Sequence, residues 1–176
     1  HRKCKLVTKI EPVQPISIPS DVLGKIVEGL IRNAVENTPD LGRIEVTVSQ
    51  GKEGPEFEVK DFGVGITDEN QRLIFDNYFT TYEIMNYSSR RPYDFMAGGK
   101  GFDLLRIKIF SERYNFKTQM VSSRCGFIPK EEDFCPGNIN NCEHIRTVKD
   151  CMNSGGTTMT IKFSPAGQHS LGHSSG

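Results

Sequence analysis

Residues 29–40 read GLIRNAVENTPD, and together with DFGVGI at 61–66 and GGKGFDL at 98–104 they are the most informative segments about the fold. The first stretch closes a segment, 22–37, in which apolar residues recur at helical spacing. The second follows an alternating, strand-like segment and carries two glycines, and the third places glycines directly before a helical pattern at 101–114. In this order, the three stretches predict helices that alternate with strands.

The segments on both sides extend the pattern. Ser20 or Asp21 is the expected cap of the first helix. We expect an edge strand at 1–10, a hairpin at 43–49 and 56–61, a short helix at 68–76, and closing strands at 118–123 and 157–163. This order predicts an α/β two-layer sandwich, in which a mixed β-sheet is covered by helices on one face.

The length of 176 residues suits a single core, so we expect one domain over 1–163. A Cys-rich insert interrupts it at about 124–154. Residues 80–100 are polar and glycine-bearing and are expected to form a long loop. Residues 164–176 lack an apolar pattern and are expected to be a disordered tail.

Composition excludes several classes of protein. Lys plus Arg and Asp plus Glu both number 22, and a neutral chain is poorly suited to wrap a nucleic-acid backbone. No apolar run reaches the ~20 residues of a membrane span, so no membrane contact is expected. The five cysteines are an odd count, and no secretory signal opens the chain. We therefore expect a reducing, cytoplasmic setting.

Three residue types in this pattern have a chemical use. The amide of Asn33 offers a neutral oxygen of the kind that Mg²⁺ prefers. Asp61 ends a strand beside glycines, where its carboxylate can accept a hydrogen bond from an exocyclic amine such as that of adenine. Glycines before a helix present N–H groups to phosphate. Taken singly, the same features are a surface asparagine, a tight turn and a flexible loop.

Together the motifs resemble the ATP-binding catalytic domain of sensor histidine kinases. The wider group includes gyrase B, mismatch-repair and heat-shock chaperone ATPases, which share the Bergerat-type ATP-binding fold. Five boxes match in order: GLIRNAVENTPD (29–40), DFGVGI (61–66), IFDNYFTT (74–81), GGKGFDL (98–104) and SGGTTMTIKF (154–163). The resemblance runs from about 15 to 123 and resumes at 155–163.

The resemblance implies roles for single residues. Asn33 would hold the Mg²⁺ that bridges the ATP phosphates, and Asp61 would bind the adenine amine. Residues 80–100 would be a lid, anchored by Phe75 and Phe79, with Thr157 or Thr158 near the base. The residues implied around the nucleotide are Asn33, Asn37, Asp61, Gly63, Gly65, Ile66, Phe79, Gly99, Lys100, Gly101, Phe102 and Thr157.

The chain departs from the family pattern at three positions. Gly29 stands where the family carries an Asn, or a catalytic Glu in its ATPase branch. Glu36 replaces a phosphate-facing Lys, and Asp103 replaces a glycine of the second glycine box. Gly29 and Asp103 favour, as the alternative, a degenerate nucleotide-binding or interaction module with little kinase activity. The missing Glu also speaks against an ATPase of the gyrase or chaperone branch.

A histidine kinase needs an acceptor histidine, and His1, His144, His169 and His173 all lack the family's acceptor pattern. We therefore expect a fragment. Its partners would be its own dimerisation and phosphoacceptor hairpin, which lies outside this chain, and a response regulator receiver domain. The full-length protein is expected to be a homodimer. Arg90 and Arg91 of the lid would supply positive charge to the γ-phosphate, or simply be exposed loop residues.

The insert carries Cys125, Cys135, Cys142 and Cys151, with His144 nearby. Zn²⁺ favours such ligands, and a small insert without a core would gain stability from it. The spacing lacks the CxxC pairs typical of zinc sites. Reduced, partly buried thiols are therefore preferred over zinc or another soft metal, and both are preferred over disulfides.

Overall fold

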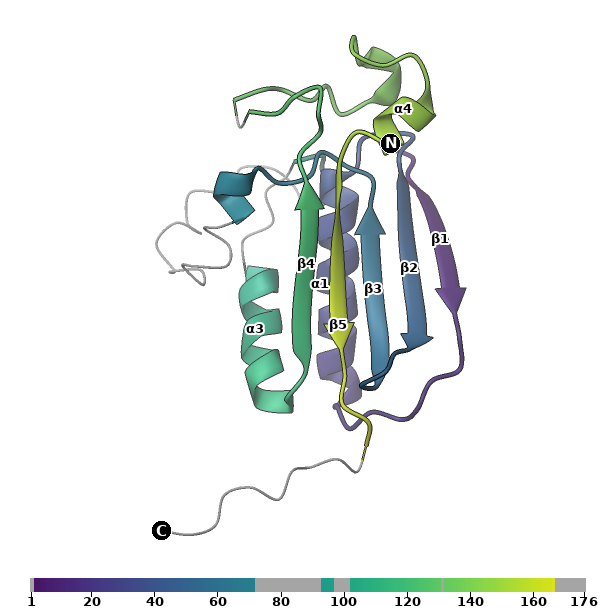
Figure 1. The fold of residues 1–176 in the computed structure, drawn as a ribbon, viewed down its shortest axis with the longest axis vertical. Helices are drawn as coiled ribbons and strands as arrows, with labels where there is room; N and C mark the ends of the chain where they lie inside the picture. Colours follow the sequence, from purple (N-terminus) through teal and green to yellow (C-terminus); the bar gives the residue numbers. More distant parts are fainter. Residues whose placement is uncertain (1, 72–92, 97–101, 131, 167–176) are drawn as a thin grey trace.

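The computed structural model describes residues 2–71, 93–96, 102–130 and 132–166, with the backbone alone at 102 and 103. Five strands form one sheet in the order β1-β2-β3-β5-β4, and only the β1–β2 pair is parallel. The strands are β1 (Lys5–Ile10), β2 (Arg43–Gln50), β3 (Pro55–Asp61), β4 (Lys117–Ser123) and β5 (Gly156–Lys162). Helices α1 (Ser20–Asn37) and α3 (Phe102–Tyr114) lie on one face of the sheet (Figure 1). The predicted mixed sheet with helices on one face is confirmed.

Helix α1 forms because its apolar side chains share one face. Ile26 and Leu30, four residues apart, are fully buried against Ile44 and Ile161 of the sheet. The predicted cap at Ser20 or Asp21 is wrong: Ser20 is already helical, and Pro19 occupies the cap position without a side-chain cap bond. A cap without a side-chain acceptor suffices here because tertiary packing, rather than capping, stabilises the helix.

The helix ends at Asn37 for a local reason. Thr38 has extended backbone angles, φ −94° and ψ 125°, and the following residue is Pro39. A residue before proline avoids the helical region because the proline ring would clash with it. The Thr38 hydroxyl donates to the Ala34 carbonyl at 2.6 Å, which satisfies one free acceptor of the last turn.

The strand register brings three polar residues into one row. In the β3–β5 pair Asp61 lies opposite Thr157, and in the β4–β5 pair Thr157 lies opposite Ser122. Phe57, Val59 and Asp61 alternate onto the buried face of β3. The row therefore continues the core-facing side of the sheet, at the end where the insert lies (Figure 1).

The insert contains two short helical elements, η2 (Ile139–Asn141) and α4 (Val148–Met152). Helix α4 begins with a capping box between Thr147 and Asp150. Residues 68–71 are helical, as predicted for 68–76, whose remainder lies outside the described residues. Within the predicted tail, Pro165 forms a β-bridge with Ile16, and the Ala166 N–H donates to the Pro15 carbonyl at 2.9 Å.

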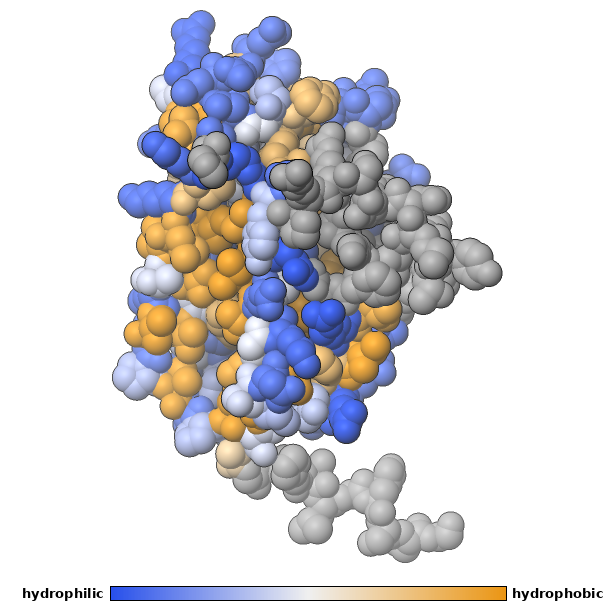
Figure 2. Space-filling model, turned by 180° about the vertical axis from the view of Figure 1, so that it is seen from behind, coloured by the Kyte–Doolittle hydropathy of each residue, from blue (hydrophilic) through white to orange (hydrophobic). Residues whose placement is uncertain are grey.

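Apolar surface continues onto the edge strand. Leu6 is 54% exposed and Ile10 is 73% exposed, although their register partners Ile44 and Val48 belong to the core side of β2. Figure 2, which views the helix-covered side, shows this apolar surface beside α1. Helix α1 therefore covers the middle strands and leaves β1 open. In the part of the chain that the structure describes, no helix has the length and hydropathy needed to cross a bilayer.

Candidate functional site

Asp61 is the most unusual charged group of the site. Its side chain is buried at the end of β3, with 6% of the residue exposed. Its Oδ1 atom accepts hydrogen bonds from the Gly63 N–H at 3.0 Å and from the Thr157 N–H at 3.2 Å. Burial raises the pKa of this carboxyl from 3.8 to about 7, and the two hydrogen bonds oppose that rise without cancelling it.

The glycine loop after Asp61 packs closely against other backbone. A Cβ at position 63 would lie 2.0 Å from the Asn37 carbonyl oxygen, and one at position 65 would lie 1.8 Å from that of Ser123. Gly65 also has a positive φ of 63°, which L-residues rarely adopt. The Val64 N–H donates to the Asn37 carbonyl at 3.2 Å. The loop is thereby held between the end of α1 and the end of β4.

Ser122 belongs to this site, although sequence reasoning missed it. Its hydroxyl lies 2.9 Å from that of Thr157 and accepts the Ile66 N–H at 3.0 Å. It also donates to the Gly156 carbonyl at 3.2 Å. The only signal for Ser122 is its place opposite Thr157, which requires the strand register and is not visible in the sequence. The structure thus links Asp61 to Ile66 through Thr157 and Ser122.

Asn33 and Asn37 lie one turn apart on α1, and both are half-buried. The Asn37 side chain donates from Nδ2 to the Asn33 carbonyl at 2.8 Å. Since the Asn37 carbonyl also accepts from the glycine loop, the last turn of α1 and the loop after Asp61 form one unit. Gly29, the turn before Asn33, is buried.

Glu36 has a structural role rather than a ligand-facing one. It is 3% exposed, and its carboxylate accepts the Tyr93 N–H at 3.1 Å. Its carbonyl accepts the Met96 N–H at 2.8 Å. Arg2 donates to the Val35 and Thr38 carbonyls, both at 2.9 Å, and to that of Tyr93. Residues 93–96 are therefore fastened to the end of α1.

Glu28, by contrast, is 62% exposed at its side chain and pairs with Arg32 at 3.8 Å. It does not turn toward the Asn33 side of the helix. Several predicted site residues lie outside the described residues: Phe75, Phe79, Arg90, Arg91, Gly98, Gly99, Lys100 and Gly101. The same holds for the side chains of Phe102 and Asp103.

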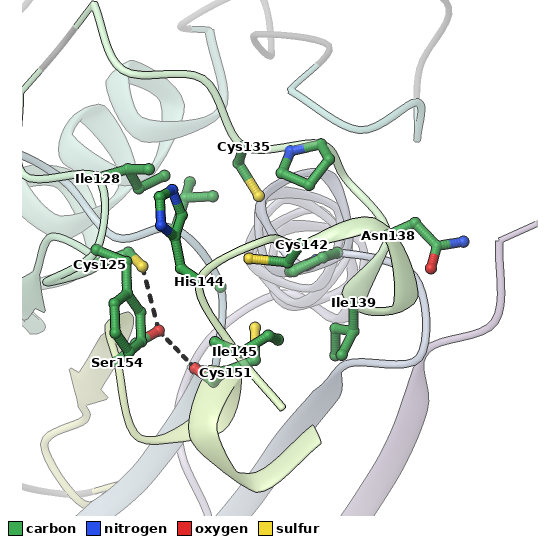
Figure 3. Close-up of a pocket in the computed structure, with 15 residues that line it drawn as sticks. Cys125, Ile128, Cys135, Asn138, Ile139, Cys142, His144, Ile145, Cys151 and Ser154 are labelled. Atoms are coloured by element: carbon green, nitrogen blue, oxygen red, sulfur yellow. Dashed lines mark hydrogen bonds between the residues drawn. The ribbon is translucent and has the colours of Figure 1, made fainter. Parts of the chain in front are cut away.

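A pocket lies between the insert and the glycine loop. From the insert it is lined by Cys125, Cys135, Cys142, Cys151 and His144 (Figure 3). Gly63 and Val64 of the glycine loop line it as well. All five cysteines of the chain are free thiols. Among the described residues, no three His, Cys, Asp or Glu side chains already have the arrangement of a metal site. Zinc in the insert stays a prediction at this point.

Comparison with known proteins adds a family match. Residues 19–167 match the family described as histidine kinase-, DNA gyrase B-, and HSP90-like ATPase. The sensor protein KdpD of Clostridium acetobutylicum is 30% identical over 131 residues, which are 66% of this chain and 14% of that protein. The sensor histidine kinase RppB of Synechocystis sp. is 27% identical over 92 residues, which are 52% of this chain and 18% of that protein. The chain thus spans less than a fifth of either relative.

Solved structures show the same fold. The mycobacterial sensor histidine kinase MprB has a TM-score of 0.56 at 18% identity, over 92% of this chain and 83% of that one. The catalytic domain of histidine kinase ThkA has a TM-score of 0.55 at 15% identity, over 92% and 80% of the two chains. The match of 19–167 includes the glycine loop, Asn33, Asp61 and Thr157.

The burial of Asp61 predicts a pH dependence of stability. Between about pH 4 and 7 the folded chain retains a proton that the unfolded chain has released, so stability falls as pH rises through this window. The fall is at most about 1.4 kcal/mol per pH unit. Asp61→Asn keeps an Oδ1 acceptor for the two N–H donors and cannot ionise. Urea unfolding at pH 5 and pH 8 should show a lower free energy of unfolding at pH 8 in the wild type, and a smaller difference in Asp61→Asn. Equal differences in the two proteins would contradict this prediction.

The surroundings of Gly65 and Gly24 predict that alanine substitution changes the free energy of unfolding in opposite directions at the two positions. Gly65→Ala should lower the free energy of unfolding by more than about 2 kcal/mol, because a Cβ there meets backbone and φ is positive. Gly24→Ala is the matched control: a Cβ at position 24 meets nothing within 4 Å, and alanine favours helix by about 1 kcal/mol. Urea denaturation of both variants tests this. Similar midpoints for the two variants would refute it.

Proposed function

The chain belongs to the histidine kinase-, DNA gyrase B- and HSP90-like ATPase family, and from this premise we propose that it is the ATP-binding catalytic domain of a sensor histidine kinase. The observation that carries the proposal is the buried Asp61 carboxylate, fixed between the glycine loop and β5. ATP and Mg²⁺ are the proposed ligands.

Asp61 is suited to hold an adenine ring. Both hydrogen bonds from Gly63 and Thr157 end on Oδ1, so Oδ2 is the oxygen that remains to accept from an exocyclic amine. A carboxylate in a low-dielectric site gains more from such a donor than one in water. Thr157 donates directly to Asp61, and Ile66 is joined to Thr157 through the Ser122 hydroxyl. We propose that Ile66 and Thr157 contact the same base.

Asn33 is suited to hold magnesium on the phosphates. Its side chain is uncharged and half-buried on the last two turns of α1, and amide oxygen is a ligand that Mg²⁺ accepts. Asn37 uses its Nδ2 on the Asn33 carbonyl, which leaves its Oδ1 for the same region. When bound, Mg-ATP supplies the γ-phosphoryl group and the charge that offsets its oxygens. The task of these residues is positioning and charge stabilisation.

The whole protein's activity goes beyond this chain. We propose that the phosphoryl group passes to a histidine on a dimerisation hairpin outside the chain, and from there to a response regulator receiver domain, in a cytoplasmic setting and within a homodimer. The names of KdpD and RppB as sensor proteins support this reading. Phe79, Gly99, Lys100, Gly101 and Phe102 stay proposed phosphate-side or lid residues.

One alternative has a specific observation behind it. Gly29 is buried and offers no side chain one turn before Asn33. A nucleotide-binding module with little kinase activity would fit that gap. Asp103, the other feature that favours this alternative, has a side chain outside the part of the chain that the structure describes. Calorimetry separates the two functions, since undetectable binding of both Mg-ATP and Mg-ADP at millimolar nucleotide would favour an interaction module.

The magnesium role of Asn33 predicts a selective loss. Asn33→Ala should weaken Mg-ATP binding about tenfold or more. A tenfold rise in Kd corresponds to a loss of about 1.4 kcal/mol of binding free energy, which is the loss we expect from removing one metal ligand. Adenosine, which has no phosphate, should bind the variant as it binds the wild type. Glu28→Ala is the matched control on the exposed side of α1. Unchanged Mg-ATP affinity in Asn33→Ala, measured by calorimetry, would remove Asn33 from the site.

The Asp61 carboxyl also predicts that nucleotide binding releases protons. Its pKa of about 7 in the free chain means that the acid is largely protonated at pH 6, whereas an amine donor favours the ionised form. ATP affinity should therefore rise between pH 6 and 8. Asp61→Asn is the control, because any protons that it still releases on binding come from groups other than Asp61, such as the ATP phosphates. Calorimetry in two buffers measures the protons; uptake rather than release would refute this role.

A further inference from the structure

Four cysteines that are distant in the sequence meet in one pocket of the insert. Cys125, Cys135, Cys142 and Cys151 all line it, and their sulfur atoms surround its interior in Figure 3. Cys4, the remaining cysteine, does not line this pocket; its sulfur lies near the Thr38 and Pro39 carbonyls at 3.9 and 3.7 Å. The convergence is therefore a property of the insert.

Each of the four thiols is carried by a different local structure. Cys125 follows β4, and its N–H donates to the Val64 carbonyl at 2.9 Å. Cys135 precedes a turn at Gly137, which has a φ of 71°. Cys142 ends η2, with its N–H donating to the Ile139 carbonyl at 3.2 Å. Cys151 lies in α4. Four independently fixed backbone segments thus present one sulfur each.

Buried apolar side chains form part of the pocket wall. Ile128 and Ile139 in its wall are 6% and 5% exposed. The cavity of about 30 Å³ has room for one ion or one or two waters. Burial raises the pKa of Cys151 to about 11, and the other three thiols nearby add to the rise. Burial also raises the pKa of Cys135. The thiolate is the form of cysteine that binds a metal, so metal binding must displace the thiol protons.

We propose that Cys125, Cys135, Cys142 and Cys151 bind one soft divalent metal ion, with Zn²⁺ as the probe. Four sulfur–metal bonds form and four thiol protons leave to solvent, with no change in oxidation state. Since no three side chains among the described residues already have metal-site geometry, binding draws the four sulfurs inward from their present positions. The complex carries a charge of about −2. Arg124, whose charge already acts on Cys135, lies near enough to offset part of it.

His144 is not assigned as a ligand. Its ring stacks on Phe127, with the centroids 6.0 Å apart and the planes inclined by 2°. Four thiols already complete the tetrahedral set that structural zinc sites use. His144→Ala should therefore leave the metal content unchanged, and loss of metal in that variant would overturn the ligand set.

Elemental analysis of the 176-residue chain, purified with reductant and without chelator, tests the proposal. We expect about one zinc per chain, and cobalt substitution should give the thiolate charge-transfer absorption of a sulfur site. Cys142→Ser and Cys151→Ser should lose both signals. Cys4→Ser, the matched control outside the pocket, should keep both. A wild-type chain that takes up no zinc from added excess, or equal loss in Cys4→Ser, would overturn the site.

A second measurement avoids variants that fail to fold. In the wild type with zinc, a thiol reagent should modify only Cys4 of the five cysteines, and a chelator should expose the other four. Mass spectrometry of peptides identifies which thiols react. Full modification of all five with zinc present would overturn the proposal. So would two disulfides among the four insert cysteines, because thiols joined in pairs are not free to hold the metal.

Discussion

A buried carboxylate at the end of β3 constrains the rest of this structure. Removing Asp61 from water is costly, and only correctly placed donors offset the cost. Those donors are the N–H groups of Gly63 and Thr157, so the loop path and the β3–β5 register are both specified by one oxygen atom. Gly156 fits the same constraint, because a Cβ there would lie 2.3 Å from the Asp61 carbonyl. The loop and the strand pairing at this end of the sheet together bury the Asp61 carboxyl.

The insert is hydrogen-bonded to the segment that follows α1, at the same end of the sheet as Asp61. The Asp40 N–H donates to the Gly137 carbonyl at 2.8 Å, and the Asp40 carboxylate accepts from Asn138 at 3.2 Å. The thiol pocket and the glycine loop share Gly63 and Val64 as a common wall. Any contraction of the pocket would therefore bear on the backbone that leads away from Asp61. The cysteine-lined pocket and the candidate site at Asp61 thus share the backbone of Gly63 and Val64.

Periodicity predicted most of the fold, because α1 and the β2–β3 hairpin each bury one face. The helix cap was predicted wrongly, since Ser20 is already helical and Pro19 occupies the cap position without a side-chain bond. The site could be predicted only as far as local motifs reach. Ser122 depends on register, and the burial of Glu36 depends on Tyr93, which is 57 positions away in the sequence. Such contacts arise from how distant segments meet, and no spacing within one segment encodes them.

The bond between Asp61 and Thr157 joins residues separated by 96 positions. The β2–β3 hairpin, by contrast, is closed by the short turn between Gln50 and Pro55. Closing a long loop costs more conformational entropy than closing a short one, and contacts of high sequence separation slow folding. A chain cut before β5 would lack the strand that supplies the Thr157 donor to Asp61. The environment of this acid is therefore complete only after residues far apart in the sequence have paired.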